Sequence, residues 1–462
     1  MPLISRRGLL ASLMPQPQTQ PNILFIMSDD HAAHAISAYG SKINSTPNID
    51  RLAKEGVRFD NCFCTNSICT PSRAAILTGQ YSHINGVNTL DDSIDIKRPT
   101  IATHLQSFGY QTAMIGKWHL GTQPQGFDHW RILPGQGVYY DPFFLEKTGR
   151  KQYQGYCTDI ITDFAIDFLK ERDASKPFFL MCHHKAPHRP WDPGPKYKNL
   201  FDDKDIPEPS NLYQPVGRGL KMRVGEDTTE RDLKMKPPEG LTGDALRKWA
   251  YQRYMKDYLR CVQSVDDSVG RILDHLDANN LRENTIVIYT SDQGFFLGDH
   301  GMFDKRLMYE ESLRMPFLAR YPKEIKAGTR NSDISLNIDF APTFLDYAGM
   351  GRDPKMQGES FRQNLQGRTP PTWRQSMYYR YWMHDDRDHH VPGHYGVRTK
   401  THKLIRYQTT EPEYELFDMK KDPHEMTNLA SKQPALVATL KREITRLQHK
   451  YGDKPYELSS SQ

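Results

Sequence analysis

Two pairs of oxygen-bearing side chains each come directly after an apolar run of the chain. Asp29 and Asp30 follow residues 22–28, and Asp292 and Gln293 follow residues 285–291. Adjacent carboxylates repel each other unless a cation joins them. Carboxylate and amide oxygens are hard ligands that suit Ca²⁺ or Mg²⁺ better than zinc. One such pair alone is more typical of a turn at a strand end, but two pairs in equivalent places predict a metal site.

Basic side chains follow two further apolar runs. Lys117 and His119 come after residues 111–115, and in an extended chain their side chains face the same side. The segment "HHKAPHRPW" after residues 177–181 offers four more basic groups, which are His183, His184, Lys185 and His188. A lone lysine or histidine is usually a surface residue, and one or two of these histidines are expected to be structural.

A single cysteine stands at the start of a predicted helix in "SICTPSRAAILTG". Cys69 lies two residues before Pro71 and four before Arg73, and the helix is predicted to end at Gly79. The chain has six cysteines, without the dense and regular spacing of a disulfide scaffold. An isolated cysteine is commonly a buried core residue, which is the alternative to a chemical role for Cys69.

The elements that must position these groups alternate along the chain. Continuous apolar runs predict strands buried on both faces at 22–28, 111–115, 177–181 and 285–291. Helical patterns lie at 47–56, 101–108, 158–170 and 252–278. This alternation predicts an α/β fold with a large, mostly parallel sheet between helices. Ligands bind beyond the carboxyl ends of such strands, where the polar groups above are found.

Three regions are predicted along the chain. Residues 1–20 form a leader and linker in which Arg6 and Arg7 resemble a twin-arginine export signal, the alternative being a basic tail. Residues 21–374 form a catalytic domain, with a long surface insertion at 192–243 placed near the rim of the site. Residues 375–462 form a smaller α+β domain of short aromatic strands and a final helix at 434–450.

Composition limits the partners. The 61 basic and 56 acidic residues leave a formal net charge of only +5, which does not favour a nucleic-acid-binding protein. No apolar run reaches the roughly 20 residues that a membrane span needs. The export signal predicts an exported, periplasmic protein, with the cytoplasm as the alternative.

Several blocks of the sequence together resemble the type I sulfatases. The motif Cys-x-Pro-x-Arg is joined, in order along the chain, by "DDH", "TPNIDRLAKEG", "GKWHLG", "APHRP", "SDQG" with "GDHG", "FDKRLMYEESLRMP" and "ELFDMKKDPHEMTNLA". The resemblance runs from about residue 21 to residue 450. It implies an alkaline-phosphatase-like fold and the hydrolysis of sulfate esters.

The resemblance also implies roles for single residues. A formylglycine-generating enzyme would oxidise Cys69 to formylglycine, whose hydrated aldehyde is the nucleophile. Ca²⁺, with Mg²⁺ less favoured, would be held by residue 69 together with Asp29, Asp30, Asp292 and Gln293. The remaining catalytic groups implied are Arg73 and Lys117 for the diol and sulfate oxygens, His119 as the base that expels sulfate, and His188 and Lys305 at the leaving oxygen.

The predicted substrate is a sulfated glycan. Blocks such as "NSICTPSRA" and "HHKAPHRPW" resemble the branch of N-acetylglucosamine-6-sulfatases, which implies the 6-O-sulfate of N-acetylglucosamine in heparan-type or related glycans. Trp191, if exposed, would stack on a sugar, and His394 and Arg398 are candidate sugar-binding groups. The alternatives are another carbohydrate sulfatase, a phosphonate monoester hydrolase or phosphodiesterase of the same superfamily, and an inactive glycan-binding relative.

Overall fold

The computed structural model describes residues 20–214, 220–409 and 411–455. Its strands are β1 Asn22–Ser28, β2 Val57–Phe63, β3 Gln111–Lys117, β4 His129–Leu133, β5 Phe143–Glu146, β6 Gly149–Gln152, β7 Phe178–His183, β8 Thr285–Ser291, β9 Phe296–Leu297, β10 Phe303–Asp304, β11 Arg314–Arg320, β12 Thr329–Asn331, β13 Ser335–Leu336, β14 Ser376–Tyr381, β15 His394–Thr399, β16 His402–Tyr407 and β17 Glu413–Asp418. Its α-helices are α1 Pro47–Glu55, α2 Cys69–Thr78, α3 Ser82–Asn85, α4 Ile101–Ser107, α5 Cys157–Glu171, α6 Glu230–Leu233, α7 Gly243–Ala278, α8 Glu310–Leu313, α9 Phe340–Tyr347, α10 Arg362–Leu365 and α11 Pro434–Tyr451.

One large sheet forms the centre of the molecule, in the order β12-β2-β11-β8-β1-β7-β3-β4-β5-β6 with β13 beside β2. The strands β8, β1, β7, β3 and β4 are parallel, while β11 runs antiparallel between β8 and β2. Every residue of β1 and of β8 is buried, as their continuous apolar sequences predict.

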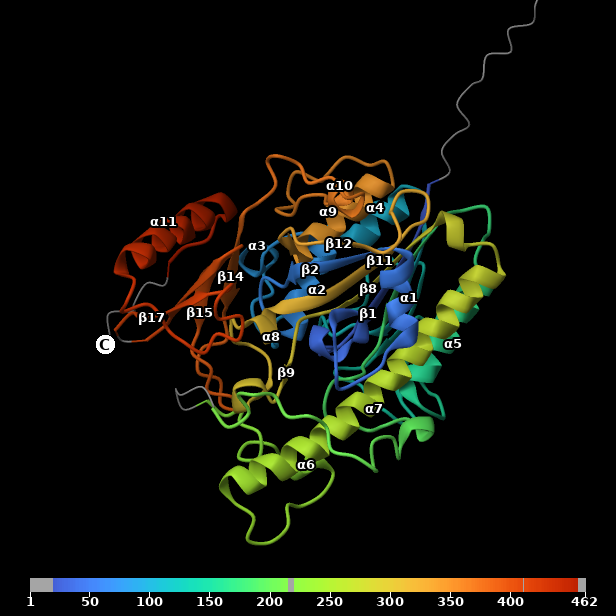
Figure 1. Cartoon of the computed structure of the whole chain (residues 1–462). Helices are drawn as coiled ribbons and strands as arrows, with labels where there is room; N and C mark the ends of the chain where they lie inside the picture. The colour runs from blue at the N-terminus through green and yellow to red at the C-terminus, as the bar shows by residue number, and fades with distance from the viewer. Residues whose placement is uncertain (1–19, 215–219, 410, 456–462) are drawn as a thin grey trace, which may run out of the picture.

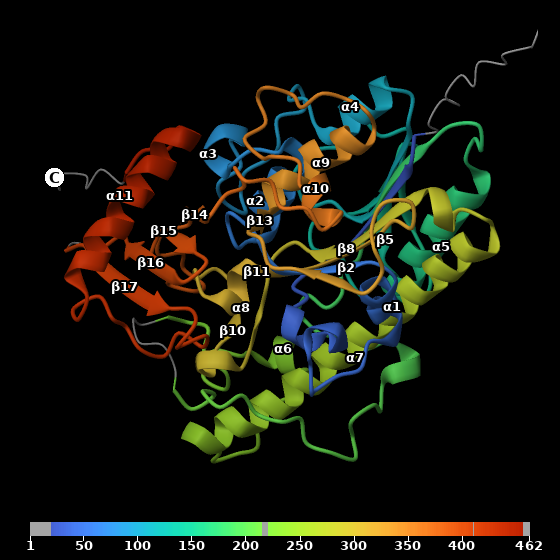
Figure 2. The same ribbon diagram turned by 45° about the horizontal axis from the view of Figure 1, so that its top comes forward.

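Helices cover both faces of this sheet (Figures 1 and 2). Helices α1, α5 and α7 contribute to the hydrophobic cluster on one face, and α2, α4 and α9 to the cluster on the other. The predicted α/β sandwich is therefore confirmed. The structure adds strands β2, β4–β6 and β11–β13, which the sequence did not reveal, and α7 begins at Gly243 rather than at residue 252.

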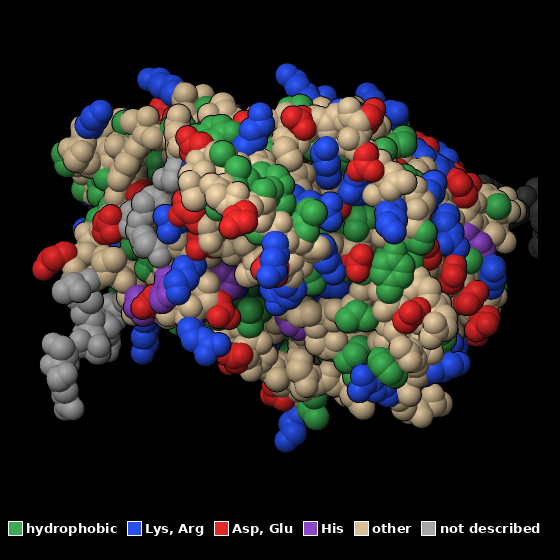
Figure 3. Space-filling model, turned by 90° about the horizontal axis from the view of Figure 1, so that it is seen from below, with side chains coloured by type: hydrophobic (Ala, Val, Ile, Leu, Met, Phe, Trp, Pro, Cys, Tyr) green, Lys and Arg blue, Asp and Glu red, His purple; other side chains and the backbone are tan. Residues whose placement is uncertain are grey.

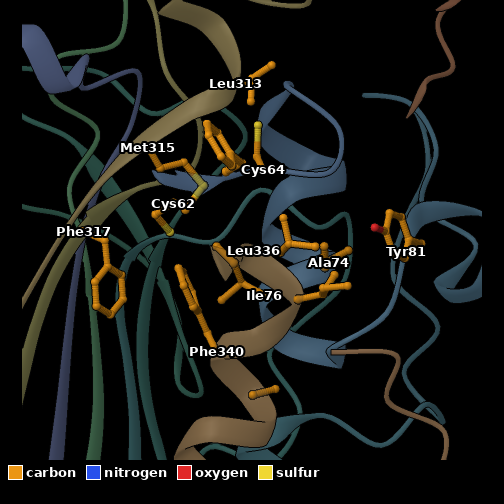
Figure 4. Close-up of a cluster of buried hydrophobic side chains, with 14 of the residues drawn as sticks. Cys62, Cys64, Ala74, Ile76, Tyr81, Leu313, Met315, Phe317, Leu336 and Phe340 are labelled. Carbon is orange, nitrogen blue, oxygen red and sulfur yellow. The ribbon is translucent and has the colours of Figure 1, made fainter. Parts of the chain in front are cut away.

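Helix α2, which begins at Cys69, lies on apolar side chains from several elements (Figure 4). Ala74 and Ile76 of α2 belong to the same buried cluster as Phe317 of β11, Leu336 of β13 and Phe340 of α9. All ten residues of α2 are buried. Because close-packed interiors resist displacement, this packing fixes the position of the helix start relative to the sheet.

A second, four-stranded antiparallel sheet has the order β14-β15-β16-β17 and packs against α11. This matches the predicted smaller α+β unit near the C-terminus. Its buried residues Tyr379, Val397 and Leu416 share one hydrophobic cluster with the main sheet, and the boundary at residue 375 stays a prediction.

The twin-arginine motif, Arg6 and Arg7, lies outside the described residues. Among the helices of the described ranges, none is both long enough and apolar enough to cross a membrane. Figure 3 shows one face of the molecule, on which acidic and basic side chains are interspersed.

Candidate active site

The register of two strands brings the predicted metal ligands together. Strands β1 and β8 are parallel neighbours, with Ser28 opposite Ser291. The residues that follow are joined as well, because the backbone N–H of Asp292 donates to the Ser28 carbonyl at 3.2 Å and that of Asp30 donates to Asp292 Oδ1 at 3.2 Å. The two oxygen-bearing pairs therefore form one site at the carboxyl ends of the strands.

This site is a buried cluster of acidic groups. Oxygens of Asp29, Asp30 and Asp292 lie within 4.8 Å of one another, and all three residues are buried. Gln293 donates a hydrogen bond from Nε2 to Asp30 Oδ1, while its Oε1 has no hydrogen-bond partner within the described ranges. Three carboxylates and an amide oxygen without a donor are the ligand set that a hard divalent cation takes, so these residues fit such an ion.

The electrostatics of the three carboxyls agree with this fit. Burial raises the pKa of Asp29, but Lys117 and the other nearby cations outweigh it and hold that pKa well below its usual value. Burial and then the charge of Asp29 raise the pKa of Asp292 to about 7. A further negative charge is thus unfavourable here unless a cation compensates it.

Cys69 lies beside this cluster at the first residue of α2. Its Sγ is 3.6 Å from Asp29 Oδ1, and the residue is 1% exposed. Burial and then Asp29 raise the pKa of the thiol to about 12. Since the thiolate is the reactive form, the unmodified Cys69 is a poor nucleophile.

Three buried cations pair with the three carboxylates. Arg73 binds Asp292, with Nε at 3.1 Å and Nη2 at 2.9 Å from Oδ2. Lys117, at the end of β3, forms an ion pair with Asp29. Lys305 contacts both oxygens of Asp30, at 2.6 and 2.7 Å. The pairs satisfy these charges and hold the side chains in fixed positions.

The two predicted catalytic histidines lie near this cluster. His188 Nε2 is 3.7 Å from Asp30 Oδ2. His119 Nδ1 is 3.3 Å from the hydroxyl of Thr70, the residue after Cys69. Burial and then Lys117 lower the pKa of His119 to about 3, so its ring is neutral at neutral pH.

The backbone is in the left-handed region at four non-glycine residues here, with φ of 63° at Asp30, 56° at His119, 86° at Asp304 and 88° at Arg306. Such conformations cost energy for residues with a Cβ, and they persist where the surrounding structure enforces them. Their concentration around one cluster marks it as a functional site.

A cavity of about 260 Å³ opens beside Cys69. It is lined by Ile68, Cys69, Leu90, Gln136, Gly137, Lys185, His188, Arg189, Pro190, Arg231, Asp304, Lys305, Arg306 and His389. Arg231 belongs to the predicted insertion at 192–243, so this part of the segment lies at the cavity. Gln136 also accepts a hydrogen bond from Lys117 Nζ at 2.5 Å.

Comparison with known proteins identifies the family. The sequence model of the family described as "Sulfatase" matches residues 21–350, which is more than half of the chain. The chain belongs to the sulfatase family. A second family model, described as "N-sulphoglucosamine sulphohydrolase, C-terminal", matches residues 298–450. The protein is therefore a sulfuric ester hydrolase, as the sequence motifs predict.

The proteins that are similar to this sulfatase include two relatives and two solved structures. An N-acetylglucosamine-6-O-sulfatase of Bacteroides thetaiotaomicron is 46% identical over 94% of this chain and 88% of its own, and an arylsulfatase of Clostridium perfringens is 30% identical over 90% and 91%. A structure described as in complex with its substrate D-glucosamine-2-N,6-O-disulfate has a TM-score of 0.92 at 44% identity, covering 96% of this chain and all of that one. The phosphonate monoester hydrolase of Agrobacterium radiobacter, at 22% identity and a TM-score of 0.77 over 93% and 96%, shares the fold.

The expectation that Trp191 is exposed is wrong. The residue is fully buried in this sulfatase, and its ring centroid lies 5.1 Å from that of Tyr254 on α7. Tyr258 and Phe295 pack against the other sides of the indole. Trp191 is a core residue, because the chain after β7 folds back onto α7, and it offers no face to a sugar.

His394 and Arg398 are also placed differently from their predicted role. The ring of His394 is buried and stacked against Tyr379 and Tyr381 in the C-terminal sheet. Arg398 pairs with Glu310 of α8 at 3.3 Å. Neither residue lines the cavity beside Cys69. The prediction that they bind a sugar in this cavity is therefore wrong.

The structure instead brings to the cavity several residues that sequence reasoning did not assign. Lys185 comes from the "HHKAPH" block, where the sequence showed it only as one basic residue among several. Gln136, Arg189, Arg306 and His389 come from separate loops, and only tertiary packing places them together. No local sequence pattern distinguishes Gln136 or His389, whereas Arg189 and Arg306 stand in the blocks "APHRP" and "FDKRLMYEESLRMP" without an assigned role.

Proposed function

We propose that this sulfatase hydrolyses the 6-O-sulfate of N-acetylglucosamine in sulfated glycans, using a formylglycine formed from Cys69. The similarity that carries the proposal is the 46% identity, over 94% of the chain, to a relative named N-acetylglucosamine-6-O-sulfatase. The 44% identical structure described with a 6-O-sulfated glucosamine as substrate supports the same choice.

A divalent cation, for which we propose Ca²⁺, would be held by Asp29, Asp30, Asp292 and Gln293, the buried oxygen donors at the ends of β1 and β8. Bound there, the ion would supply Lewis-acid polarisation of the sulfate group. The formylglycine, made by a formylglycine-generating enzyme, would supply the nucleophile at position 69. The high pKa of the unmodified Cys69 thiol supports its role as a precursor rather than a thiolate catalyst.

The side chains around this centre have distinct tasks in the proposal. Arg73 and Lys117 orient the groups at residue 69, since their own positions are fixed by buried ion pairs. His119, whose ring is neutral, accepts a proton near residue 69. His188 and Lys305 line the cavity on the side of Asp30 and would stabilise or protonate the leaving oxygen.

The depth of the site favours a primary sulfate. Cys69 and the carboxylates are buried, and Cys69 lines a cavity of about 260 Å³. A 6-sulfate projects from its ring and would reach residue 69 while the ring stays near the rim. A sulfate attached directly to the ring would require the ring itself to descend.

The substrate proposal is tested with a panel of sulfated sugars. N-acetylglucosamine 6-sulfate should be desulfated with a higher kcat/KM than 2-sulfated uronic acids or 4- and 6-sulfated N-acetylgalactosamine. A site that hydrogen-bonds one epimer leaves polar groups unpaired with the other, which discriminates strongly. If a sulfated galactosamine or uronic acid has the highest kcat/KM, the proposed substrate is wrong. If an aryl phosphodiester is hydrolysed faster than any sulfate ester, the proposed sulfatase reaction is wrong.

Export to the periplasm is proposed on the twin-arginine motif alone. Fractionation of cells that make the full chain, compared with an Arg6→Lys and Arg7→Lys double variant, tests it. Export should be lost in the double variant, and equal export of both proteins would contradict the proposal.

A further inference from the structure

Lys185 is a buried cation on the wall of the active-site cavity. It is 2% exposed, it lines the same cavity as Cys69 and His188, and its Nζ has no hydrogen-bond partner within the described ranges. A buried ammonium without a partner is costly, and natural proteins keep one where it has a use.

Each of the other lysines and arginines of the cavity has a carboxylate partner, although Arg189 and Arg306 share Asp304. Of the lysines and arginines that line it in the described part of the chain, Lys185 alone has no carboxylate within ion-pair distance. The others pair as follows: Arg189 and Arg306 with Asp304, Arg231 with Asp232, and Lys305 with Asp30. The three innermost carboxylates are likewise matched by Arg73, Lys117 and Lys305. Within the described residues, Lys185 is therefore the cavity lysine whose ammonium has neither an ion-pair partner nor a hydrogen-bond acceptor.

Local contacts fix where this charge lies. The backbone N–H of His188 donates to the Lys185 carbonyl at 3.0 Å, and that of Asp29 donates to the Ala186 carbonyl at 3.3 Å, so the turn that carries Lys185 is tied to both sides of the site. The ammonium lies 4.9 Å from the ring centroid of Tyr139. A cation–π contact of this kind holds the charge in place without using its N–H donors. The hydroxyl of Tyr139 donates to the His188 carbonyl at 2.7 Å, which fixes the ring.

We propose that Lys185 is a substrate-binding residue whose ammonium donates to an oxygen of the substrate's sulfate group, and of the sulfate ion that leaves. The proposal rests on the sulfatase function proposed above and adds to it a cation that the family motifs did not assign. The incoming anion supplies both the missing negative charge and the missing acceptor. Burial and then Lys117 lower the pKa of Lys185 to about 8, so at neutral pH the ammonium form still predominates.

The alternative is that Lys185 has a purely structural role. The unfolding temperature of a Lys185 variant distinguishes this role from substrate binding. If Lys185 serves the fold, replacing it lowers the unfolding temperature. If it is kept for the substrate, Lys185→Met removes an unbalanced buried charge while preserving the length of the side chain. The variant should then unfold at the same temperature as the wild type or higher, and bind sulfate less well.

The experiment uses inorganic sulfate as the probe. The inhibition constant of sulfate against desulfation of N-acetylglucosamine 6-sulfate is measured for wild type, Lys185→Met, Lys185→Arg and the control Lys196→Met. Lys196 is exposed and paired with Asp267, so its variant carries the same change in net charge away from the cavity. The sulfate-dependent rise in unfolding temperature is measured in parallel as a readout that needs no turnover.

We expect the inhibition constant to increase about tenfold or more in Lys185→Met, because hydrogen bonds between charged groups are the strong ones. Lys185→Arg should recover part of the affinity, and Lys196→Met should stay within about twofold of the wild type. An unchanged inhibition constant in Lys185→Met, or a lowered unfolding temperature with unchanged sulfate binding, would overturn the proposal. A wild type that desulfates no sugar of the panel would reject the proposed function instead, while the unfolding measurements would still test Lys185.

Discussion

Arg73 and Asp292 are joined by two hydrogen bonds to one oxygen, from Nε at 3.1 Å and Nη2 at 2.9 Å to Oδ2. Both side chains are almost completely buried. The remaining nitrogen, Nη1, donates to the Lys117 carbonyl at 2.6 Å. The guanidinium therefore links α2, which carries Cys69, to the ends of β8 and β3, and fixes the position of residue 69 relative to the carboxylates.

Replacing Arg73 should damage both stability and catalysis. Arg73→Met leaves Asp292 buried without its partner, which costs about 3–5 kcal/mol for a buried pair. Arg73→Lys keeps the charge but lacks the planar fork, so kcat/KM should fall about 100-fold through misplacement of residue 69. Urea unfolding and steady-state kinetics measure the two effects.

Arg271→Met is the matched control for this prediction. Arg271 pairs with Asp163 on the surface, where an ion pair contributes about 1 kcal/mol or less. Its variant should keep wild-type activity and stability. If Arg73→Lys retained full kcat/KM, the positioning role of the guanidinium would be refuted.

Cys69→Ala should abolish desulfation without unfolding the protein. The side chain is small, so its removal leaves little empty volume, while the precursor of the nucleophile is lost. Cys62→Ala is the control, because Cys62 is equally buried but lies in the hydrophobic cluster below α2. Mass spectra of the tryptic peptide that contains residue 69 should show formylglycine in wild type and Cys62→Ala. Residual turnover by Cys69→Ala near the wild-type rate would contradict the prediction.

Removal of divalent cations should lower both activity and the unfolding temperature. The carboxyls of Asp29, Asp30 and Asp292 are buried close together, and burial and then the charge of Asp29 raise the pKa of Asp292, so a bound cation would stabilise their ionised forms. At 100 times its Kd, a ligand of the native state stabilises by about 2.7 kcal/mol. Calorimetry with and without a chelator, followed by addition of Ca²⁺ or Mg²⁺, measures the effect.

Asp30→Asn should weaken this metal-dependent stabilisation, and Asp163→Asn, at an exposed ion pair, should leave it unchanged. Identical unfolding temperatures and rates after exhaustive chelation would show that the acidic cluster works without a metal.

The meeting of the oxygen-bearing pairs could be predicted from the sequence because it depends on local rules. Asp29 and Asp292 follow continuous apolar runs, and parallel strands place such positions at one edge of the sheet. The strands that were missed break these rules. In β11 the run contains Pro316 at a register irregularity, and β2 has a mixed burial pattern beside it. Proline and mixed patterning hide a strand from a periodicity argument.

The cavity wall could not be predicted in the same way. Gln136, Arg231 and His389 reach the cavity from three segments far apart in the sequence, and nothing in each segment alone marks its side chain. The burial of Trp191 could not be predicted either, because it depends on how the loop packs. A tryptophan within a proline-rich loop has the same local sequence whether the loop lies open or folds onto a helix, and here it packs on α7.

Substitutions of Trp191 should therefore affect stability rather than sugar binding. Trp191→Ala removes a fully buried indole between Tyr254, Tyr258 and Phe295 and should cost about 3–5 kcal/mol in the free energy of unfolding. Trp191→Phe keeps an aromatic ring in the same place and should cost less, with KM for N-acetylglucosamine 6-sulfate within about twofold of the wild type. Val138→Ala, at a side chain that is 54% exposed, is the control and should change neither quantity. Unfolding curves together with KM, measured at a temperature where every variant is folded, decide the question. A large increase in KM for Trp191→Phe at unchanged stability would show that Trp191 contributes to sugar binding.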